Sequence, residues 1–142
     1  MNVYIDSSVL LRIVLGEPGR LRGWRTITRP FSSELLRLEC LRTIDRARIR
    51  CDLADDEVAE RRAAILEHIK AFDLIRLDPR VLERAAEPFP TILGSLDAIH
   101  LASAVLARRD IPDLMLATHD VQLATAARAV GFRVLGASSP SP

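Results

Sequence analysis

Four acidic residues lie within or beside apolar runs, where a folding chain rarely places carboxylates unless they are paired or bind a metal. They are Asp6, Glu39, Asp97 and Asp120. Oxygen ligands without a cysteine or histidine cluster are typical of Mg²⁺ or Mn²⁺ sites rather than zinc sites. A bound cation would relieve the repulsion between clustered carboxylates. The pattern therefore predicts a shared divalent-cation site and a metal-dependent enzyme.

Hydrolysis of a phosphodiester is the chemistry that such a site would support. Two Mg²⁺ ions about 3.5–4 Å apart can activate a water and stabilise the leaving oxygen. This reaction needs clustered acids and no covalent nucleophile. Ser8 and Thr118 each lie close in sequence to one of the acids. We expect them either to orient a carboxylate or metal-bound water or to act only as local caps.

Each acid also has a purely structural alternative. Asp6, Asp97 and Asp120 lie at or near the starts of expected helices, where a carboxylate caps the helix or interacts with its dipole. Glu39 is three residues before Arg42, so an ion pair along one helix is its alternative. These alternatives are reasonable one by one. Taken together, however, they leave four carboxylates converging without matching cations.

Two histidines and a cysteine near these acids are expected to be structural. His100 shares a helix face with Asp97, and we expect it to be a core histidine with a hydrogen-bond partner rather than a ligand. His119 precedes Asp120 in an extended segment, so its side chain should point away from its neighbours. Cys40 lies among leucines and is expected to be a packed, inert thiol.

Alternating strands and helices should position these residues. The expected strands are 2–5, 26–32, 72–77, 114–117 and 132–135, and the expected helices are 8–15, 20–25, 33–48, 52–71, 79–87, 96–108 and 121–130. This order predicts an α/β protein with three α/β/α layers and a mainly parallel sheet. Pro30 should make its strand an edge strand or a short one. Asp6 and Asp120 then follow strand carboxyl ends, where such sheets bind ligands.

Composition indicates one domain, expected at 1–136 and followed by a disordered tail at 137–142. Of the 142 residues 49% are hydrophobic and 27% charged, and the net charge is +1. No apolar run is long enough for a membrane span and no signal peptide is evident, so we expect a cytoplasmic protein. Four arginines, at 20, 22, 25 and 29, form a local cluster that is either a basic patch for a polyanion or a solvated loop.

Four segments of the chain resemble PIN-domain nucleases, and within that group the VapC toxins of bacterial type II toxin–antitoxin systems. They are Tyr4-Ile5-Asp6-Ser7-Ser8, Ser33-Glu34-Leu35-Leu36-Arg37-Leu38-Glu39, Leu96-Asp97-Ala98-Ile99-His100-Leu101-Ala102 and Thr118-His119-Asp120. The third segment is the most specific, and the four together span nearly the whole chain. Phosphatases of the haloacid-dehalogenase type are a poorer match, because they need an aspartate at the position of Ser8.

The resemblance implies a PIN-like fold and an endoribonuclease that hydrolyses RNA with metal-activated water. It makes Asp6, Glu39, Asp97 and Asp120 a Mg²⁺ site, with Mn²⁺ as the alternative ion. Asp6 and Asp97 are the surest ligands. Glu39 is a less certain ligand because Glu34 lies earlier in the same segment, and Asp120 is less certain because the fourth acid varies among such nucleases. The resemblance also implies an RNA substrate, a homodimer and a VapB-like antitoxin. A non-catalytic PIN-like module that only binds a partner is the alternative.

Overall fold

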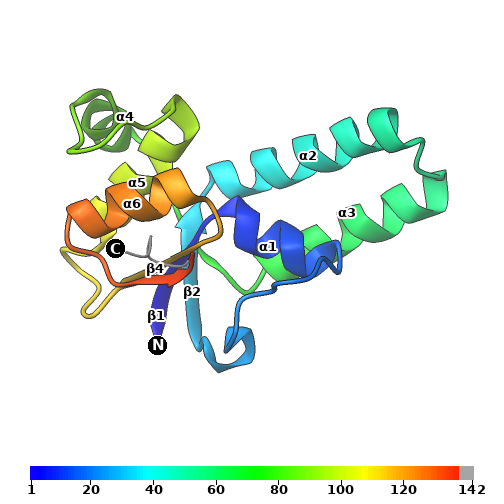
Figure 1. Ribbon diagram of the computed structural model, residues 1–142, viewed down its shortest axis with the longest axis horizontal. Coiled ribbons are helices and arrows are strands. Elements are labelled where there is room, and N and C mark those ends of the chain that lie inside the picture. The colour runs from blue at the N-terminus through cyan, green and yellow to red at the C-terminus, as the bar shows by residue number, and fades with distance from the viewer. Residues whose placement is uncertain (138–142) are drawn as a thin grey trace.

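Five parallel strands form the central sheet, in the order β3-β2-β1-β4-β5 (Figure 1). A computed structural model describes residues 1–137, so the tail expected at 137–142 lies, apart from Ala137, outside the described residues. The strands are β1 (Asn2–Ile5), β2 (Arg29–Ser33), β3 (Asp73–Ile75), β4 (Met115–Thr118) and β5 (Val134–Gly136). The helices are α1 (Ser7–Val14), α2 (Leu35–Cys51), α3 (Asp55–Ile69), α4 (Pro79–Ala86), α5 (Ser95–Ala107) and α6 (Val121–Ala129), with a 3₁₀ turn at Trp24–Thr26.

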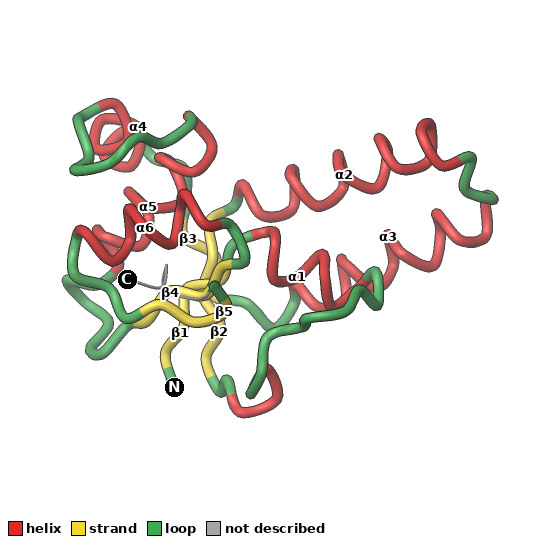
Figure 2. The backbone as a smooth tube through the Cα atoms, viewed as in Figure 1, coloured by secondary structure: helices red, strands yellow, loops and turns green. Residues whose placement is uncertain are grey.

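Helices cover both faces of the sheet, so the expected three-layer α/β/α fold is confirmed (Figure 2). Alternate residues of a strand point to opposite faces. In β1, Val3 and Ile5 join the core under α1, α2 and α3, while Tyr4 joins the core under α5 and α6. In β4, Leu116 shares the Tyr4 side. Within residues 1–137, each helix is too short or too polar to cross a bilayer.

The sheet has a switch point between β1 and β4, where the side of β1 on which successive strands are added changes. β2 and β3 follow on one side of β1, whereas β4 and β5 lie on the other side. Ile5 of β1 is in register with Ala117 of β4, so the residues that follow these two strands are neighbours. Asp6 follows β1, and Asp120 lies two residues after β4. Both acids therefore lie at the switch point, where open α/β sheets bind their ligands.

Pro30 lies in β2, and its strand is short but not at the edge. β2 has five residues and runs between β3 and β1. Pro30 pairs with Val3 of β1, while the pairing with β3 begins only at Phe31. Because β3 does not extend alongside Pro30, the missing N–H leaves no ladder bond unmade on that side. Of the two expected alternatives, an edge strand or a short one, the structure shows the short one.

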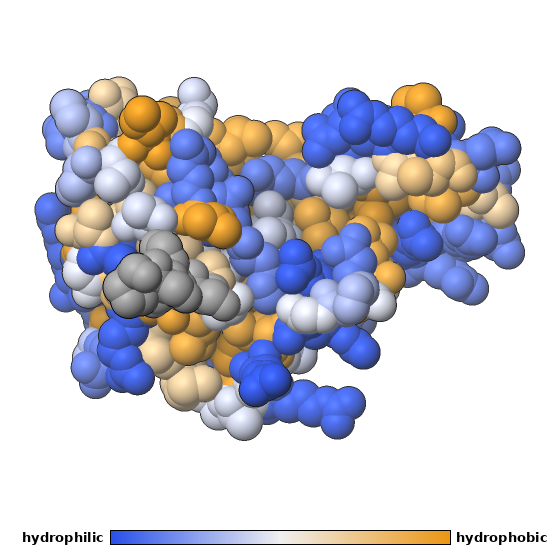
Figure 3. All heavy atoms as spheres, in the orientation of Figure 1, coloured by the Kyte–Doolittle hydropathy of each residue, from blue (hydrophilic) through white to orange (hydrophobic). Residues whose placement is uncertain are grey.

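The hairpin of α2 and α3 extends well beyond the sheet (Figure 1). Its helices were expected at 33–48, with Ser32 or Ser33 as the N-cap, and at 52–71, with Asp52 or Asp55 as the N-cap. Instead α2 continues to Cys51 and ends at Asp52, which has a left-handed φ of 48°, and Ala54 is the N-cap of α3. Aspartate tolerates this conformation better than most residues. Most of the hairpin surface in Figure 3 is hydrophilic, with hydrophobic side chains between.

Candidate active site

Asp6 is a buried carboxylate surrounded by hydroxyl groups. Its side chain is 3% exposed and accepts hydrogen bonds from Ser8 Oγ at 2.6 Å and Thr118 Oγ1 at 2.9 Å. The amide of Val9 donates to the same carboxylate at 3.4 Å, so Asp6 also caps α1. Burial raises the pKa of the Asp6 carboxyl, and the hydroxyl bonds and nearby His100 oppose that shift. The capping alternative is thus true of Asp6, but it does not explain the burial of the charge.

Ser8 and Thr118 join the two strand ends into one network. Ser8 Oγ accepts the amide of His119 at 2.9 Å, and Thr118 Oγ1 accepts the amide of Asp120 at 2.9 Å. Each hydroxyl therefore donates to Asp6 and accepts from the segment that carries Asp120. Asp120 itself is exposed, and its Oδ1 accepts the amide of Leu123 at 2.8 Å as the cap of α6. Its other carboxylate oxygen remains available to a ligand.

Asp97 is half-buried in the first turn of α5 and has no structural partner. The N-cap of α5 is a glycine, and Asp97 makes no hydrogen bond or ion pair within residues 1–137. Burial raises the pKa of the Asp97 carboxyl to about 6, and the negative charges of Asp120, Asp6 and Glu39 act in the same direction. Asp97 is therefore not the cap of α5, although its place in the first turn lets its carboxylate interact with the helix dipole. The charges of the three other acids also act on this carboxylate.

Glu39 is held by His100 rather than by an arginine. His100 is 1% exposed, and its Nε2 is hydrogen-bonded to Glu39 Oε1 while its Nδ1 bonds Tyr4 Oη at 2.8 Å. The expected core histidine is thus confirmed. Its two partners belong to different elements, α2 and β1, and the sequence indicated neither of them. The only available signal was the placement of His100 on the Asp97 face of α5.

Two alternatives for this part of the site are excluded. Arg42 pairs with Asp45 at 2.9 Å, so the alternative ion pair with Glu39 does not form. Glu34 precedes α2, and its Oε2 accepts the amide of Leu77 at 3.1 Å. Its carboxylate is therefore engaged by the segment after β3. Of the two glutamates, Glu39 is the one that lies with the other acids.

His119 faces away from the acids, as its place in an extended segment predicts. Its ring lines a cavity whose other walls include Arg20 and Gly136 and none of the four acids. Burial lowers the pKa of the His119 imidazole, and the charge of Arg12 lowers it further. Nε2 of this ring is buried without a hydrogen-bond partner among the described residues. Cys40 is fully buried, and burial raises the pKa of its thiol to about 12, which fits the expected inert role.

The donor set at the switch point consists of carboxylate and hydroxyl oxygens, which is the chemistry that Mg²⁺ prefers. Within residues 1–137, no three histidine, cysteine, aspartate or glutamate side chains lie close enough to form a ready-made metal cage. Magnesium keeps several waters and often takes only one or two carboxylates directly. Asp6 and Asp97 fit an ion bound in that way. The assignment of Mg²⁺ or Mn²⁺ to the four acids stays a prediction.

A groove runs along the acidic site between α1, α2 and α5. It has a volume of about 480 Å³, and Glu39 lies in its wall together with Leu38 and Leu96. The leucines are 56% and 49% exposed, which is unusual for large apolar side chains beside a polar site. Arg42 and Arg46 line the same groove. The groove therefore combines exposed apolar and basic side chains, a mixture that is common at protein–protein interfaces.

Comparison with known proteins identifies the class. Residues 3–129 match the PIN domain family, so the chain belongs to that family. It is 34% identical to Ribonuclease VapC46 of Mycobacterium tuberculosis over 96% of this chain and 98% of the relative. It is 31% identical to Ribonuclease VapC47 of the same species over 92% and 93%. Within the PIN-domain family, the chain therefore belongs to the VapC ribonucleases of toxin–antitoxin systems.

Two solved structures share the fold at low sequence identity. A toxin–antitoxin complex from Klebsiella pneumoniae superposes with a TM-score of 0.64 at 17% identity, covering 99% of this chain and 98% of that one. The VapBC2 complex of Rickettsia felis, bound to a DNA fragment from its promoter, gives a TM-score of 0.67 at 8% identity, covering 95% and 99%. The PIN-like fold expected from the sequence is confirmed.

Proposed function

We propose that this VapC-family protein is the toxin of a type II toxin–antitoxin pair and a Mg²⁺-dependent endoribonuclease, with Mn²⁺ as a substitute ion. Asp97 carries the proposal. Its half-buried carboxylate has no partner in the described chain, and three further acids raise its pKa. An unpaired acid among other acids destabilises a protein unless a ligand compensates. A divalent cation is the simplest compensating ligand.

The four acids would have unequal roles. Asp6 and Asp97 would bind the cation most directly, because one is fixed by hydroxyls and the other is unpaired. Glu39 has one oxygen engaged by His100, so its second oxygen would face the ion or its water. Asp120 is the exposed member, and it would act at the open side where RNA enters. Ser8 and Thr118 would orient the Asp6 carboxylate rather than touch the substrate.

When bound, Mg²⁺ would supply positive charge for the phosphodiester and activate a water for hydrolysis. No residue of the chain is required as a covalent nucleophile. The carboxylates concentrate negative charge at the switch point, so RNA should approach productively only when the cation is present.

RNA cleavage by the purified protein tests this function. We expect cleavage with Mg²⁺ or Mn²⁺ that is abolished by EDTA, by Asp6→Asn and by Asp97→Asn. Asp110→Asn is the matched control, because Asp110 is exposed, lines a cavity away from the acids and should leave cleavage unchanged. Cleavage that survives both site substitutions would indicate a contaminating nuclease. Failure to cleave RNA or to bind metal by calorimetry would favour the non-catalytic partner-binding module.

A VapB-like antitoxin is the protein partner that we propose. The groove beside Glu39 supports its placement, because Leu38 and Leu96 offer apolar contact at the edge of the acidic site. An antitoxin segment lying there would cover the acids and block RNA. An RNA substrate and this partner together imply a cytoplasmic protein. Leu38→Ser combined with Leu96→Ser should weaken the complex while RNA cleavage by the free toxin persists, as measured by calorimetry and cleavage assays.

We also propose a homodimer. Ile92 is 82% exposed and Leu82 is 49% exposed, in the segment of α4 and the loop that follows it. Exposed large apolar side chains on one segment are common at subunit interfaces. Sedimentation equilibrium of the free protein should give twice the chain mass of 15.8 kDa. Ile92→Ser should shift that mass toward the monomer, and a wild-type monomer would contradict the proposal.

A further inference from the structure

The segment between α1 and β2 carries three arginines without partners. Arg20, Arg22 and Arg25 are exposed, and none forms an ion pair within residues 1–137. Arg29 is different, because it pairs with Asp73 at 3.2 Å and its guanidinium lies 5.0 Å from the Phe31 ring. The arginine cluster of the sequence therefore divides into one structural residue and three cations that are unpaired among the described residues. Three unpaired cations on one loop favour a polyanionic ligand.

These arginines line three adjoining cavities. The first cavity has a volume of about 510 Å³, and it shares Trp24, Arg25 and His68 with a second cavity of about 490 Å³. The second shares Arg20 with a third, of about 500 Å³, that His119 also lines. Because neighbouring cavities share wall residues, the three lie side by side along the loop, and together they are called the track below.

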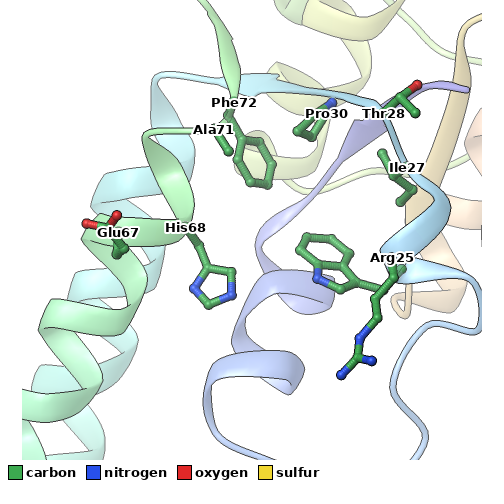
Figure 4. A pocket seen from close by; sticks show the side chains of 9 residues that line it. Arg25, Ile27, Thr28, Pro30, Glu67, His68, Ala71 and Phe72 are labelled. Carbon is green, nitrogen blue, oxygen red and sulfur yellow. The ribbon is translucent and has the colours of Figure 1, made fainter.

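Aromatic rings surround the outer end of this track. The Trp24 ring centre is 6.5 Å from those of His68 and Phe72, with the planes tilted by 42° and 39°. Figure 4 shows the His68 ring directed from α3 across the cavity toward the segment that carries Arg25. His68 Nδ1 lies 2.7 Å from the Ala64 carbonyl, which only accepts hydrogen bonds. Nδ1 is therefore the donor, and in the neutral ring Nε2 remains free to accept a bond.

Glu67, the acidic residue in the wall of the first cavity, does not neutralise the positive charge of the arginines. Glu67 lines the first cavity, but its carboxylate is paired with Lys70 Nζ at 2.7 Å. Arg25 in the same wall has no such partner. The outer cavity thus combines an unpaired guanidinium, an indole ring and an imidazole acceptor. These groups match the phosphate, the base and the sugar hydroxyl of a nucleotide.

The inner end of the track is linked to the acidic site through His119. His119 lines the third cavity, and its backbone amide donates to Ser8 Oγ at 2.9 Å. Ser8 in turn donates to the buried carboxylate of Asp6 at 2.6 Å. The track therefore starts on the far side of His119 from the acids and ends at Trp24.

We propose that this track is the path of single-stranded RNA leading away from the cleavage site. Phosphates would contact Arg20, Arg22 and Arg25, and one base would stack on Trp24 beside His68. Stacking on aromatic rings combined with a basic groove is how proteins bind single strands without reading their sequence. The inference rests on the proposed ribonuclease function, but RNA binding along the track does not itself require metal.

Trp24 fluorescence tests the path directly, because Trp24 is the only tryptophan in the chain. Wild-type protein in EDTA is titrated with an oligouridylate of about ten nucleotides, within the usual range of single-strand sites. We expect the RNA to quench Trp24 emission and a duplex of equal length to quench it far less. Each arginine that contacts a phosphate should contribute a slope of about −0.7 to the salt dependence of binding.

Arginine variants extend the test without disturbing the core. Arg20→Ala combined with Arg25→Ala should weaken binding of the labelled oligonucleotide about ten-fold by anisotropy and reduce the salt slope. Arg109→Ala is the matched control, because Arg109 is exposed at the end of α5 and lines none of the three cavities. It should bind RNA like the wild type. In Mg²⁺, the double variant should cleave RNA with a lower kcat/KM.

The same experiments can also contradict the proposed RNA path. Unchanged Trp24 emission with RNA, together with wild-type kcat/KM in the double variant, would reject it while leaving the nuclease function intact. Emission that changes with protein concentration alone would assign the track to a second copy of the chain. RNA-dependent quenching in a protein that cuts no RNA in Mg²⁺ would instead support the path and reject the proposed activity.

Discussion

Glu39 and His100 are joined by a hydrogen bond between Oε1 and Nε2, although they lie on different helices and 61 residues apart. An ionised carboxylate only accepts, so Nε2 is the donor. In the neutral ring Nδ1 then accepts the hydroxyl of Tyr4 at 2.8 Å. The chain of bonds runs from the core residue Tyr4 to an acid of the proposed metal site. His100 thus links the stability of the fold to the orientation of Glu39.

Replacing His100 should destabilise the protein. His100→Ala leaves the buried hydroxyl of Tyr4 and the carboxylate of Glu39 without this partner and opens a cavity. We expect the free energy of unfolding to fall by about 2–4 kcal/mol in urea titrations. Tyr4→Phe removes only one bond of the chain and should cost about 1 kcal/mol. A His100→Ala variant within about 0.5 kcal/mol of the wild type would contradict this account.

Asp97 should make the metal-free protein less stable as the pH rises. Its pKa is raised from 3.8 to about 6 in the folded protein, so the folded state binds the proton more tightly than the unfolded state. Stability is therefore lost as the pH rises from 3.8 to about 6, and the loss persists above that range. Asp97→Asn should remove this loss and raise stability in EDTA at neutral pH by about 1 kcal/mol, a value reduced for solvent screening of a half-exposed group.

Thermal unfolding in EDTA and in Mg²⁺ checks the same prediction. Metal should raise the Tm of the wild type, because a ligand that binds only the folded state stabilises it. The Tm of Asp97→Asn should respond little. Asp110→Asn is the control, and it should follow the wild type in both conditions. A wild type that is more stable than Asp97→Asn in EDTA at pH 7 would show that Asp97 has a structural partner after all.

The positions of Asp6 and Asp120 could be predicted from the sequence because both follow buried strands. Parallel strands present their carboxyl ends at one edge, so strand order alone brings such residues together. Asp97 could be placed near the start of its helix for a similar reason, since local punctuation sets where a helix begins. These inferences needed only hydrophobic periodicity and the breaker residues between elements.

The partner of Glu39 and the ends of the hairpin could not be predicted. Which residue of α5 meets Glu39 depends on how two helices pack on opposite faces of the sheet, and no local pattern encodes that packing. Asp52 was expected to begin α3, but it ends α2 in a left-handed conformation. The same residue type serves both positions, so sequence alone left the choice open. The cavities around Trp24 likewise require α3 and a distant loop to meet.

Gly136 should be intolerant of a side chain. Its φ is +96°, and a Cβ atom there would lie 2.6 Å from the carbonyl oxygen of Thr118. Because that oxygen belongs to the backbone of β4, the neighbour cannot move away cheaply. Gly136→Ala should lower the free energy of unfolding by about 2 kcal/mol or more in urea titrations. Gly94→Ala, where nothing lies within 4 Å, should change it far less. Equal effects would contradict the steric argument.

Thr118 should matter for metal affinity beyond its effect on folding. Thr118→Val keeps the shape of the side chain but removes the donor to Asp6 and the acceptor of the Asp120 amide, both at 2.9 Å. Asp6 would then lose orientation, and affinity for Mg²⁺ in calorimetry should fall about 10–100-fold. Thr125→Val is the matched control, because the Thr125 hydroxyl bonds only to the Val121 carbonyl on an exposed face. If both variants bound Mg²⁺ equally well, Thr118 would be a structural residue alone.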